Sequence, residues 1–262
     1  MKPLKLYIGK TINESILDDE DVLLDPERDK EIIKSWIEDN YKIGGRLKIN
    51  NDYTVDCSGD VDVKNKNITS LTNDMFSWGK IDGDFYCSDC ENLKFLEGAP
   101  KEVGGDFYCS DCENLKFLEG APEKVGGYFS CCRCKNLRSL KGVPVKVGGS
   151  FYCNNCENLT SLKGAPKEVG RYFDCSGCKN IRSLKGAPVK VGGNFYCNNC
   201  ENLTSLKGAP EKINGNFDCS YCENLTSLEG GPKEVKNGFF HCANCPKLKI
   251  TDSDLKKYKI ES

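Results

Sequence analysis

The sequence contains few of the residues from which catalytic centres and membrane spans are usually built. Its 262 residues include one histidine, two tryptophans and two methionines. No apolar run approaches the roughly 18 residues of a membrane-spanning helix, and the N-terminal stretch lacks the apolar core and cleavage site of a signal peptide. The 37 basic residues do not outnumber the 39 acidic ones, whereas a nucleic-acid binder normally carries a basic excess. We therefore expect a cytoplasmic protein with neither a membrane nor a nucleic-acid partner.

Cysteine, in contrast, is abundant and periodic. The chain has 18 cysteines, and most of them form Cys-x-x-Cys pairs. The first cysteines of the pairs recur every 22 residues, with one final step of 23, at Cys87, Cys109, Cys131, Cys153, Cys175, Cys197, Cys219 and Cys242. Each unit follows the template F-x-C-x-x-C-x-N-L-x-x-L-x-G-x-P-x-x-V-x-G-x. A unit this short cannot bury an apolar face alone, so the repeat predicts a solenoid of stacked coils.

The pattern within each unit predicts one short strand followed by an irregular arc. In the stretch F-Y-C, the phenylalanine and the cysteine should point inward and the tyrosine outward. The return arm G-A-P-x-x-V-G-G is too short and too rich in proline and glycine for a helix, so we expect an extended or 3₁₀-like arm whose proline and valine pack inward. The predicted fold is mainly β, a right-handed solenoid whose strands align into one parallel sheet.

This repeat resembles that of the leucine-rich repeat family, in particular its short bacterial and phage-type forms. The resemblance covers about residues 58–250. It is carried by the inward positions of each coil, for example Phe107, Cys109, Cys112, Leu115 and Leu118. The chain departs from the family template in its aromatic first strand position and in its two cysteines. The resemblance implies a binding scaffold and no particular ligand.

The segment before the repeat is expected to cap the solenoid. The sequence from Asp25 to Asn40 predicts a helix, with Asp25 as its N-cap and Pro26 in its first position. Its predicted apolar face consists of Ile32, Ile33, Trp36 and Ile37. The stretch LKLYI near the start is expected to form a strand.

The repeat itself should begin with a shorter initial coil. There, the positions of Phe, Cys, Leu and Leu are taken by Val61, Val63, Ile68 and Leu71. After the last unit, the tail TDSDLKKYKIES is expected to form a short capping helix. We therefore divide the chain into a capping region (1–52), the solenoid (53–250) and a C-terminal cap or tail (251–262).

The paired cysteines allow two interpretations. Consecutive pairs have the spacing C-x₂-C-x₁₈-C-x₂-C, which is typical of structural zinc sites, so a metal-binding (zinc or Fe–S) or redox protein is one alternative. Equivalent side chains of stacked coils, however, lie about 4.8 Å apart and parallel, so they do not converge on one metal. We therefore predict reduced core thiols and no cofactor. Cys57 is expected to be packed, whereas Cys132, at an outward position, is expected to be an exposed thiol.

The outward face of the sheet is the predicted binding surface. It presents an aromatic residue in every coil, surrounded by short polar groups, which is typical of protein-binding faces. The predicted partner-binding residues are Tyr86, Tyr108, Tyr128, Arg133, Tyr152, Tyr172, Tyr196, Tyr221, Asp84 and Asp106. The carboxylates of the first two coils favour a partner with basic residues. The alternative is that the tyrosines only stack on one another and protect the sheet.

The repeat offers no asymmetric constellation of the kind that catalysis requires. His241 precedes Cys242, but strand alternation points one outward and the other inward, so we expect no nucleophile–base pair. We therefore predict a non-enzymatic scaffold that binds a protein partner through the tyrosine-bearing face. A structural, self-assembling component of virion type is the remaining alternative.

Overall fold

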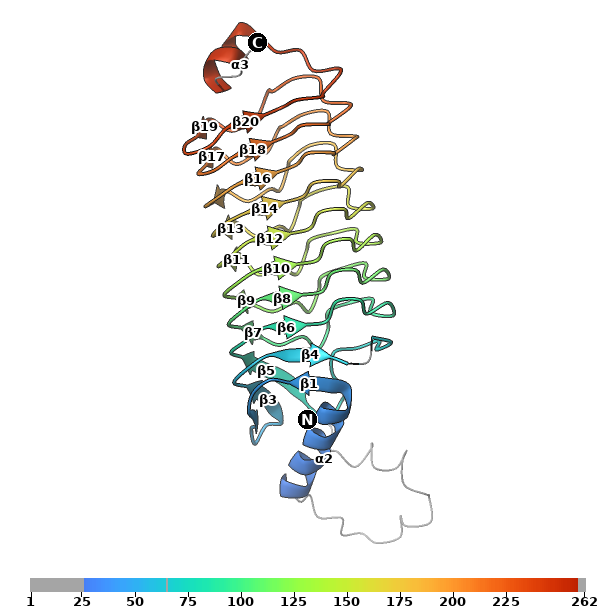
Figure 1. Cartoon of the computed structure of the whole chain (residues 1–262). Coiled ribbons are helices and arrows are strands. Elements are labelled where there is room, and N and C mark those ends of the chain that lie inside the picture. The colour runs from blue at the N-terminus through green and yellow to red at the C-terminus, as the bar shows by residue number, and fades with distance from the viewer. Residues whose placement is uncertain (1–25, 65, 259–262) are drawn as a thin grey trace.

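Two parallel sheets run along an elongated β-solenoid (Figure 1). The computed structural model describes residues 26–64 and 66–258. Helix α2 (Pro26–Asn40) lies at the N-terminal end and helix α3 (Asp252–Tyr258) at the C-terminal end. The expected N-cap Asp25 and the expected strand LKLYI lie outside the described residues.

Each sheet contains ten short strands: one from the capping region at its N-terminal edge and one from each of nine coils of the solenoid. Sheet A consists of β1 (Tyr41–Ile43), β4 (Val61–Val63), β6 (Phe85–Tyr86), β8 (Phe107–Tyr108), β10 (Phe129–Ser130), β12 (Phe151–Tyr152), β14 (Phe173–Asp174), β16 (Phe195–Tyr196), β18 (Phe217–Asp218) and β20 (Phe240–His241). Sheet B consists of β2 (Leu47–Ile49), β3 (Thr54–Cys57), β5 (Ser77–Ile81), β7 (Glu102–Val103), β9 (Lys124–Val125), β11 (Lys146–Val147), β13 (Glu168–Val169), β15 (Lys190–Val191), β17 (Lys212–Ile213) and β19 (Glu234–Val235).

The register of the sheets follows the sequence period. Phe107 pairs with Phe129, and this one-coil offset recurs along sheet A. Identical rings therefore stack inside the solenoid: the ring centroids of Phe151 and Phe173 lie 5.6 Å apart, with the ring planes 9° from parallel. At the last step, β18 pairs with β20 so that Phe217 meets Phe240. The extra residue of the final unit is therefore accommodated between β19 and β20, outside the paired strands.

The sequence predicted one parallel sheet, and the structure contains a second one. The return arm, which we expected to be extended, forms the two-residue strands of sheet B. Val125 pairs with Val103 on one side and with Val147 on the other. The arm continues to bond beyond each strand, because the amide of Gly126 donates to the carbonyl of Val103. The paired stretch of each arm has a single inward residue, such as Val125, whereas in sheet A an inward phenylalanine and an inward cysteine enclose an outward residue. The arm therefore shows no alternating pattern by which to recognise a strand.

The interior consists of the inward positions that the repeat predicted. The phenylalanines, the paired cysteines, the leucines and the valines of the coils are buried, except at the last coil, where Cys242 and Cys245 are half-buried. The prolines of the return arms are also buried. The glycine two residues before the proline of each return arm has a positive φ, as at Gly120 (φ 88°), where a Cβ atom would lie 2.5 Å from the amide nitrogen of Glu97. This corner therefore requires glycine.

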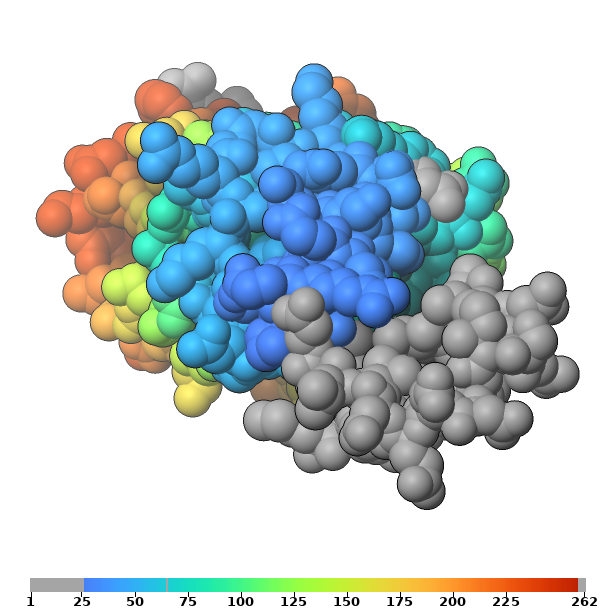
Figure 2. All heavy atoms as spheres, turned by 90° about the horizontal axis from the view of Figure 1, so that it is seen from below, coloured from blue at the N-terminus to red at the C-terminus, as the bar shows by residue number. Residues whose placement is uncertain are grey.

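Both ends of the solenoid are covered. Ile33 and Ile37 of α2 are fully buried against the first coils, and Figure 2 shows α2 lying across the N-terminal end. Ile32, which we expected on the same helix face, is exposed instead. At the other end, the ring of Tyr258 in α3 stacks on Phe240 at 3.9 Å. Neither helix of the described part of the chain is long and apolar enough to cross a membrane.

The initial coil behaves as expected. Val61 pairs with Phe85, and Val61, Val63 and Leu71 are fully buried. Two antiparallel pairs join the capping region to the solenoid: β1 pairs with β4, and β2 pairs with β3.

Candidate binding face

The outward side chains of sheet A form two columns, which we call the tyrosine face. The first column precedes the strands and consists of Asp60, Asp84, Asp106, Tyr128, Ser150, Tyr172, Asn194, Asn216 and Phe239. The second column lies on the strands and consists of Asp62, Tyr86, Tyr108, Ser130, Tyr152, Asp174, Tyr196, Asp218 and His241. Because successive coils pair in register, like positions of both columns run side by side along the solenoid.

The six tyrosines of this face are arranged in three pairs. The rings of Tyr86 and Tyr108 are stacked, with centroids 4.9 Å apart and planes 5° from parallel. The other two pairs meet edge to face: Tyr128 with Tyr152 at 5.9 Å, and Tyr172 with Tyr196 at 6.4 Å. Such pairs contribute about 0.5–1.5 kcal/mol beyond the area they bury. Five of the six rings are half-buried, while Tyr172 is 41% exposed.

The carboxylates of the first coils have a structural role that the sequence analysis missed. The Oδ1 atom of Asp84 accepts the amide of Asp106 at 2.7 Å, and Oδ1 of Asp106 accepts the amide of Tyr128 at 2.6 Å. Their second oxygens accept the phenols of Tyr86 and Tyr108, at 2.6 Å and 2.7 Å. These two carboxylates thus accept backbone amides of the next coil and hold two tyrosine rings in place. We call this run of coil-to-coil bonds the acceptor ladder.

The acceptor ladder continues along the chain with neutral side chains. The Ser150 hydroxyl accepts the amide of Tyr172 at 3.1 Å, and Oδ1 of Asn194 accepts the amide of Asn216 at 2.8 Å. The amide group of Asn194 also donates to the phenol of Tyr196. A run of Asp, Asn and Ser at 22-residue spacing, just before the strand, was the sequence signal for this ladder.

Both phenols of the stacked pair remain protonated well above neutral pH. The hydrogen bond to Asp84 is the main cause of the raised pKa of Tyr86. Burial, followed by the hydrogen bond to Asp106, raises the pKa of Tyr108. The stacked pair therefore presents neutral rings beside charged carboxylates.

Arg133 and Tyr221 occupy a further column that lies in the turn after each strand. Residues of this column have a left-handed backbone, with φ of 56° at Arg133 and 60° at Tyr221. In most other coils the position holds Asp, Asn or Gly, which tolerate that conformation better. Arg133 is not free for a partner, because Nε and Nη2 each donate to Asp111 at 2.6 Å. Tyr221, in contrast, is 53% exposed.

The prediction that Cys132 is an exposed thiol was wrong. Its side chain does point to the outward face, but it is only 9% exposed. The thiol donates to Oδ1 of Asn154 in the next coil at 2.7 Å and lies 3.2 Å from the hydroxyl of Ser130. The Ser130 hydroxyl in turn lies 2.8 Å from that of Ser110. Small side chains therefore fill the middle of the face between the first and second tyrosine pairs. Cys57, as expected, is buried.

The two cysteines of each pair have different surroundings, which the sequence did not reveal. The second thiol donates to the carbonyl of the first cysteine in the preceding coil, as from Cys134 to Cys109 (3.1 Å) and from Cys178 to Cys153 (3.1 Å). These carbonyls face the interior at the turn after the strand. All 18 cysteines are free thiols, and within the described residues no group of three or more potential ligands is placed to hold a metal ion.

At the end of β20, the side chain of His241 points outward and that of Cys242 points inward, as strand alternation predicted. His241 is exposed on the tyrosine face, with its ring centroid 6.1 Å from that of Phe239. Cys242 is half-buried and packs against the core. The imidazole and the thiol therefore face different environments.

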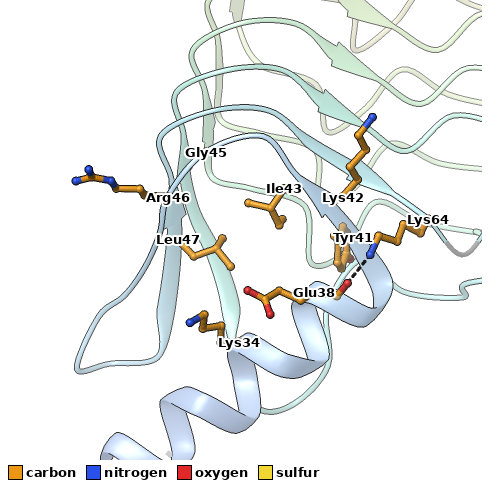
Figure 3. A pocket seen from close by; sticks show the side chains of 9 residues that line it. All are labelled: Lys34, Glu38, Tyr41, Lys42, Ile43, Gly45, Arg46, Leu47 and Lys64. Atoms are coloured by element: carbon orange, nitrogen blue, oxygen red, sulfur yellow. Dashed lines mark hydrogen bonds between the residues drawn. The ribbon is translucent and has the colours of Figure 1, made fainter.

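A basic pocket of about 550 Å³ lies at the N-terminal end, between α2 and the first strands (Figure 3). Four cations line it, Lys34, Lys42, Arg46 and Lys64, with Glu38 as the single carboxylate. Lys64 donates to the carbonyl of Glu38 at 2.5 Å. In Figure 3, Lys42 and Arg46 point away from the centre of the pocket. The charges therefore do not converge as a site for a compact anion requires.

No family model, no curated protein and no solved structure matches this chain. The leucine-rich-repeat relationship therefore stays a prediction from the repeat.

Proposed function

We propose that this chain is a cytoplasmic, non-enzymatic scaffold of leucine-rich-repeat type that binds a protein partner through the tyrosine face. The observation that carries this proposal is the row of three tyrosine pairs on one continuous sheet surface. Tyrosine supplies large contact area with little side-chain freedom to lose. Ring pairing and the bonds from Asp84, Asp106 and Asn194 fix several of these rings before a partner arrives, which lowers the entropic cost of binding.

The thiols support the proposed compartment. All 18 cysteines are unpaired, including neighbours in adjacent coils, and the cytoplasm keeps protein thiols reduced. In an oxidising compartment, the half-buried thiols of Cys242 and Cys245 at the last coil would be open to oxidation.

The test is capture of a partner by the intact chain, compared between matched variants. In Y152A/Y172A two neighbouring rings from different pairs are removed near the middle of the face, where binding energy usually concentrates. Loss of each anchor should cost roughly 2 kcal/mol or more, so recovery of the partner should fall at least about thirtyfold. The two lost ring pairs should lower the melting temperature by only several degrees, so the chain stays folded.

The control is K163E/K207E, which changes charge on the exposed arcs outside both sheets. This variant should recover the partner as well as the unmodified chain does. If the lysine variant loses the partner and the tyrosine variant keeps it, the partner binds the arcs. The tyrosines would then serve only to cover sheet A.

A further inference from the structure

The two columns of the tyrosine face carry charge of a single sign, while Arg171 beside them donates to the phenol of Tyr128 at 3.4 Å. The columns contain six carboxylates and no lysine or arginine: Asp60, Asp62, Asp84, Asp106, Asp174 and Asp218. Of these, Asp62 has Lys66 as an ion-pair partner from outside the columns, at 3.4 Å. The face is therefore acidic as well as aromatic.

The negative charge is not needed to build the face. Ser150, Asn194 and Asn216 accept the same coil-to-coil amide bonds that Asp84 and Asp106 accept. Asn194 also holds Tyr196 as Asp106 holds Tyr108. Neutral side chains in later coils thus accept the amide of the next coil and hold a tyrosine ring. What the carboxylates add to these bonds is the negative charge of the surface.

The outward side of sheet B has the opposite character. We call it the lysine face and define it as the outward strand residues of β5 to β19 together with the exposed residue before each of these strands. It contains eight lysines and five glutamates: Lys80, Lys101, Lys124, Lys146, Lys167, Lys190, Lys212, Lys233, Glu102, Glu123, Glu168, Glu211 and Glu234. Val145 and Val189 on this face are 65% and 66% exposed. Five of these lysines form ion pairs with the glutamates, for example Lys190 with Glu168 at 2.8 Å, and Lys80 pairs with Asp82 at 2.6 Å. Because eight lysines face five glutamates, the surface keeps a net positive charge and is partly apolar.

The two faces also share one spacing. Every coil contributes one strand to sheet A and one to sheet B, so both surfaces repeat at the same distance, about 4.8 Å. When two copies lie with parallel axes, each row of the tyrosine face of one copy can meet a row of the lysine face of the other along the whole solenoid. A partner of unrelated fold would match this spacing only locally.

We propose that the partner of the tyrosine face is a second copy of this chain, which binds through its lysine face. This inference rests on the proposed function and names its partner. Because the two surfaces differ, the contact is heterologous, and each bound copy leaves one face of each kind open for another. The product is an open row of solenoids rather than a closed dimer.

The expected strength is modest. Eight coils span about 40 Å, and a strip about 15 Å wide would bury on the order of 600 Å² per copy. This is less than the roughly 800 Å² of a standard stable interface. Association should therefore depend strongly on protein concentration, and it should weaken at high salt because the attraction between the faces is screened.

Two variants that each inactivate one face provide the test. Y152A/Y172A impairs the tyrosine face, and K146E/K212E impairs the lysine face at two exposed lysines whose glutamate contacts are long, at 3.8 Å and 3.5 Å. Sedimentation velocity from about 1 μM to about 1 mM follows the mass of each sample. The unmodified chain should grow beyond a dimer in ~50 mM salt and dissociate in ~500 mM salt.

Each variant alone should remain monomeric, and an equimolar mixture should form dimers and nothing larger, because only one competent face of each kind remains. K163E/K207E, with the same charge change away from both faces, should assemble like the unmodified chain. Thermal unfolding of all variants verifies that they are folded. A monomeric unmodified chain, self-assembly of K146E/K212E alone, or no rescue in the mixture would each overturn the inference. If the chain is monomeric but still captures another protein through its tyrosines, the proposed function stands without this partner.

Discussion

The thiol of Cys156 donates a hydrogen bond to the carbonyl oxygen of Cys131, 3.2 Å away in the preceding coil. The same bond recurs along the solenoid, from Cys112 to Cys87 and from Cys200 to Cys175, for example. From Cys112 onward, the second cysteine of each pair thus satisfies a carbonyl that faces the interior and would otherwise be costly to bury. The first cysteine fills space in the stacked core, and at Cys131, Cys175 and Cys219 its thiol also reaches a carbonyl of the next coil, at 3.5, 3.4 and 3.3 Å. One motif therefore contains two residues with different tasks.

These tasks predict opposite responses to substitution. At Cys156, C156S should be tolerated better than C156A, because a hydroxyl can still donate to the Cys131 carbonyl. The alanine leaves that oxygen unpaired, at a cost of about 1–3 kcal/mol. At Cys153, which points into the core between Cys131 and Cys175, C153A should be tolerated better than C153S. A serine there buries a hydroxyl among thiols and apolar groups.

Urea unfolding of the four variants at neutral pH measures the difference. Y152F, which removes the phenol oxygen of the half-buried, outward residue before Cys153, is the matched control and should change the free energy of unfolding little. The same preference at both positions, whether for serine or for alanine, would contradict the two roles.

The buried thiols also predict that the fold is lost in mild alkali. Burial is the main cause of raised thiol pKa values at Cys87, Cys109, Cys134, Cys153, Cys175, Cys197, Cys219 and Cys222. In the unfolded chain each ionises near its ordinary pKa of about 8.5. Below that value both states are protonated and stability is complete. As the pH rises above it, only the unfolded state loses protons, so stability falls by up to about 1.4 kcal/mol per thiol and pH unit.

Eight such thiols can remove a typical 5–15 kcal/mol of stability within about one to two pH units above 8.5. Circular dichroism and thiolate absorbance, recorded together against pH, should therefore change in one cooperative step near pH 9–10. Cys242, at the open last coil, provides a check on the native state, since burial raises its pKa to about 11. Its alkylation below the transition should accelerate about tenfold per pH unit. A solenoid that keeps its circular dichroism at pH 11 would contradict the burial of the cysteine columns.

The sequence was sufficient to predict the stacked coils, because inward residues such as Phe107 and Leu115 recur at one spacing and must be buried together. It did not predict sheet B, because each paired stretch, such as Lys124–Val125, has only one inward residue and shows no alternation. The burial of Cys132 depends on Asn154, a neighbour in space contributed by the next coil. Such contacts follow from how closely coils approach, which the period alone does not fix.

The candidate site was predicted in its location but not in its internal bonding. The tyrosines do share one face, as alternation required, while the ring pairs and the engagement of Arg133 by Asp111 depend on side-chain geometry between coils. The bonds of Asp84 and Asp106 were recognisable in principle from the column of short acceptors. From the sequence alone, those carboxylates are assigned to partner binding, which stays a prediction, whereas the structure shows their bonds within the fold.

The acceptor ladder predicts that charge and structure can be separated at Asp84. D84A should lower the free energy of unfolding by about 1–3 kcal/mol, because the amide of Asp106 and the phenol of Tyr86 both lose their acceptor. D84N should cost much less, since Asn194 already performs both tasks in a later coil. N194A is the matched control and should resemble D84A. Urea unfolding at neutral pH compares the three, and an equal loss in D84A and D84N would mean that the carboxylate charge itself stabilises the fold.

The left-handed position in the turn after each strand predicts that Tyr221 lowers the free energy of unfolding. Its left-handed backbone (φ 60°) is unfavourable for a bulky side chain, and the equivalent position holds Gly177 (φ 66°) two coils earlier. Y221G should therefore raise the free energy of unfolding by roughly 0.5–1 kcal/mol, because glycine adopts this conformation readily. The reverse change, G177A, should destabilise, since its Cβ atom would lie 2.2 Å from Oδ1 of Asn155. Thermal unfolding of both variants measures whether each change raises or lowers stability.

If Y221G is destabilised instead, the exposed ring of Tyr221 contributes packing that outweighs its backbone strain. If the stabilised Y221G also loses the partner, the strain at this position is maintained for binding.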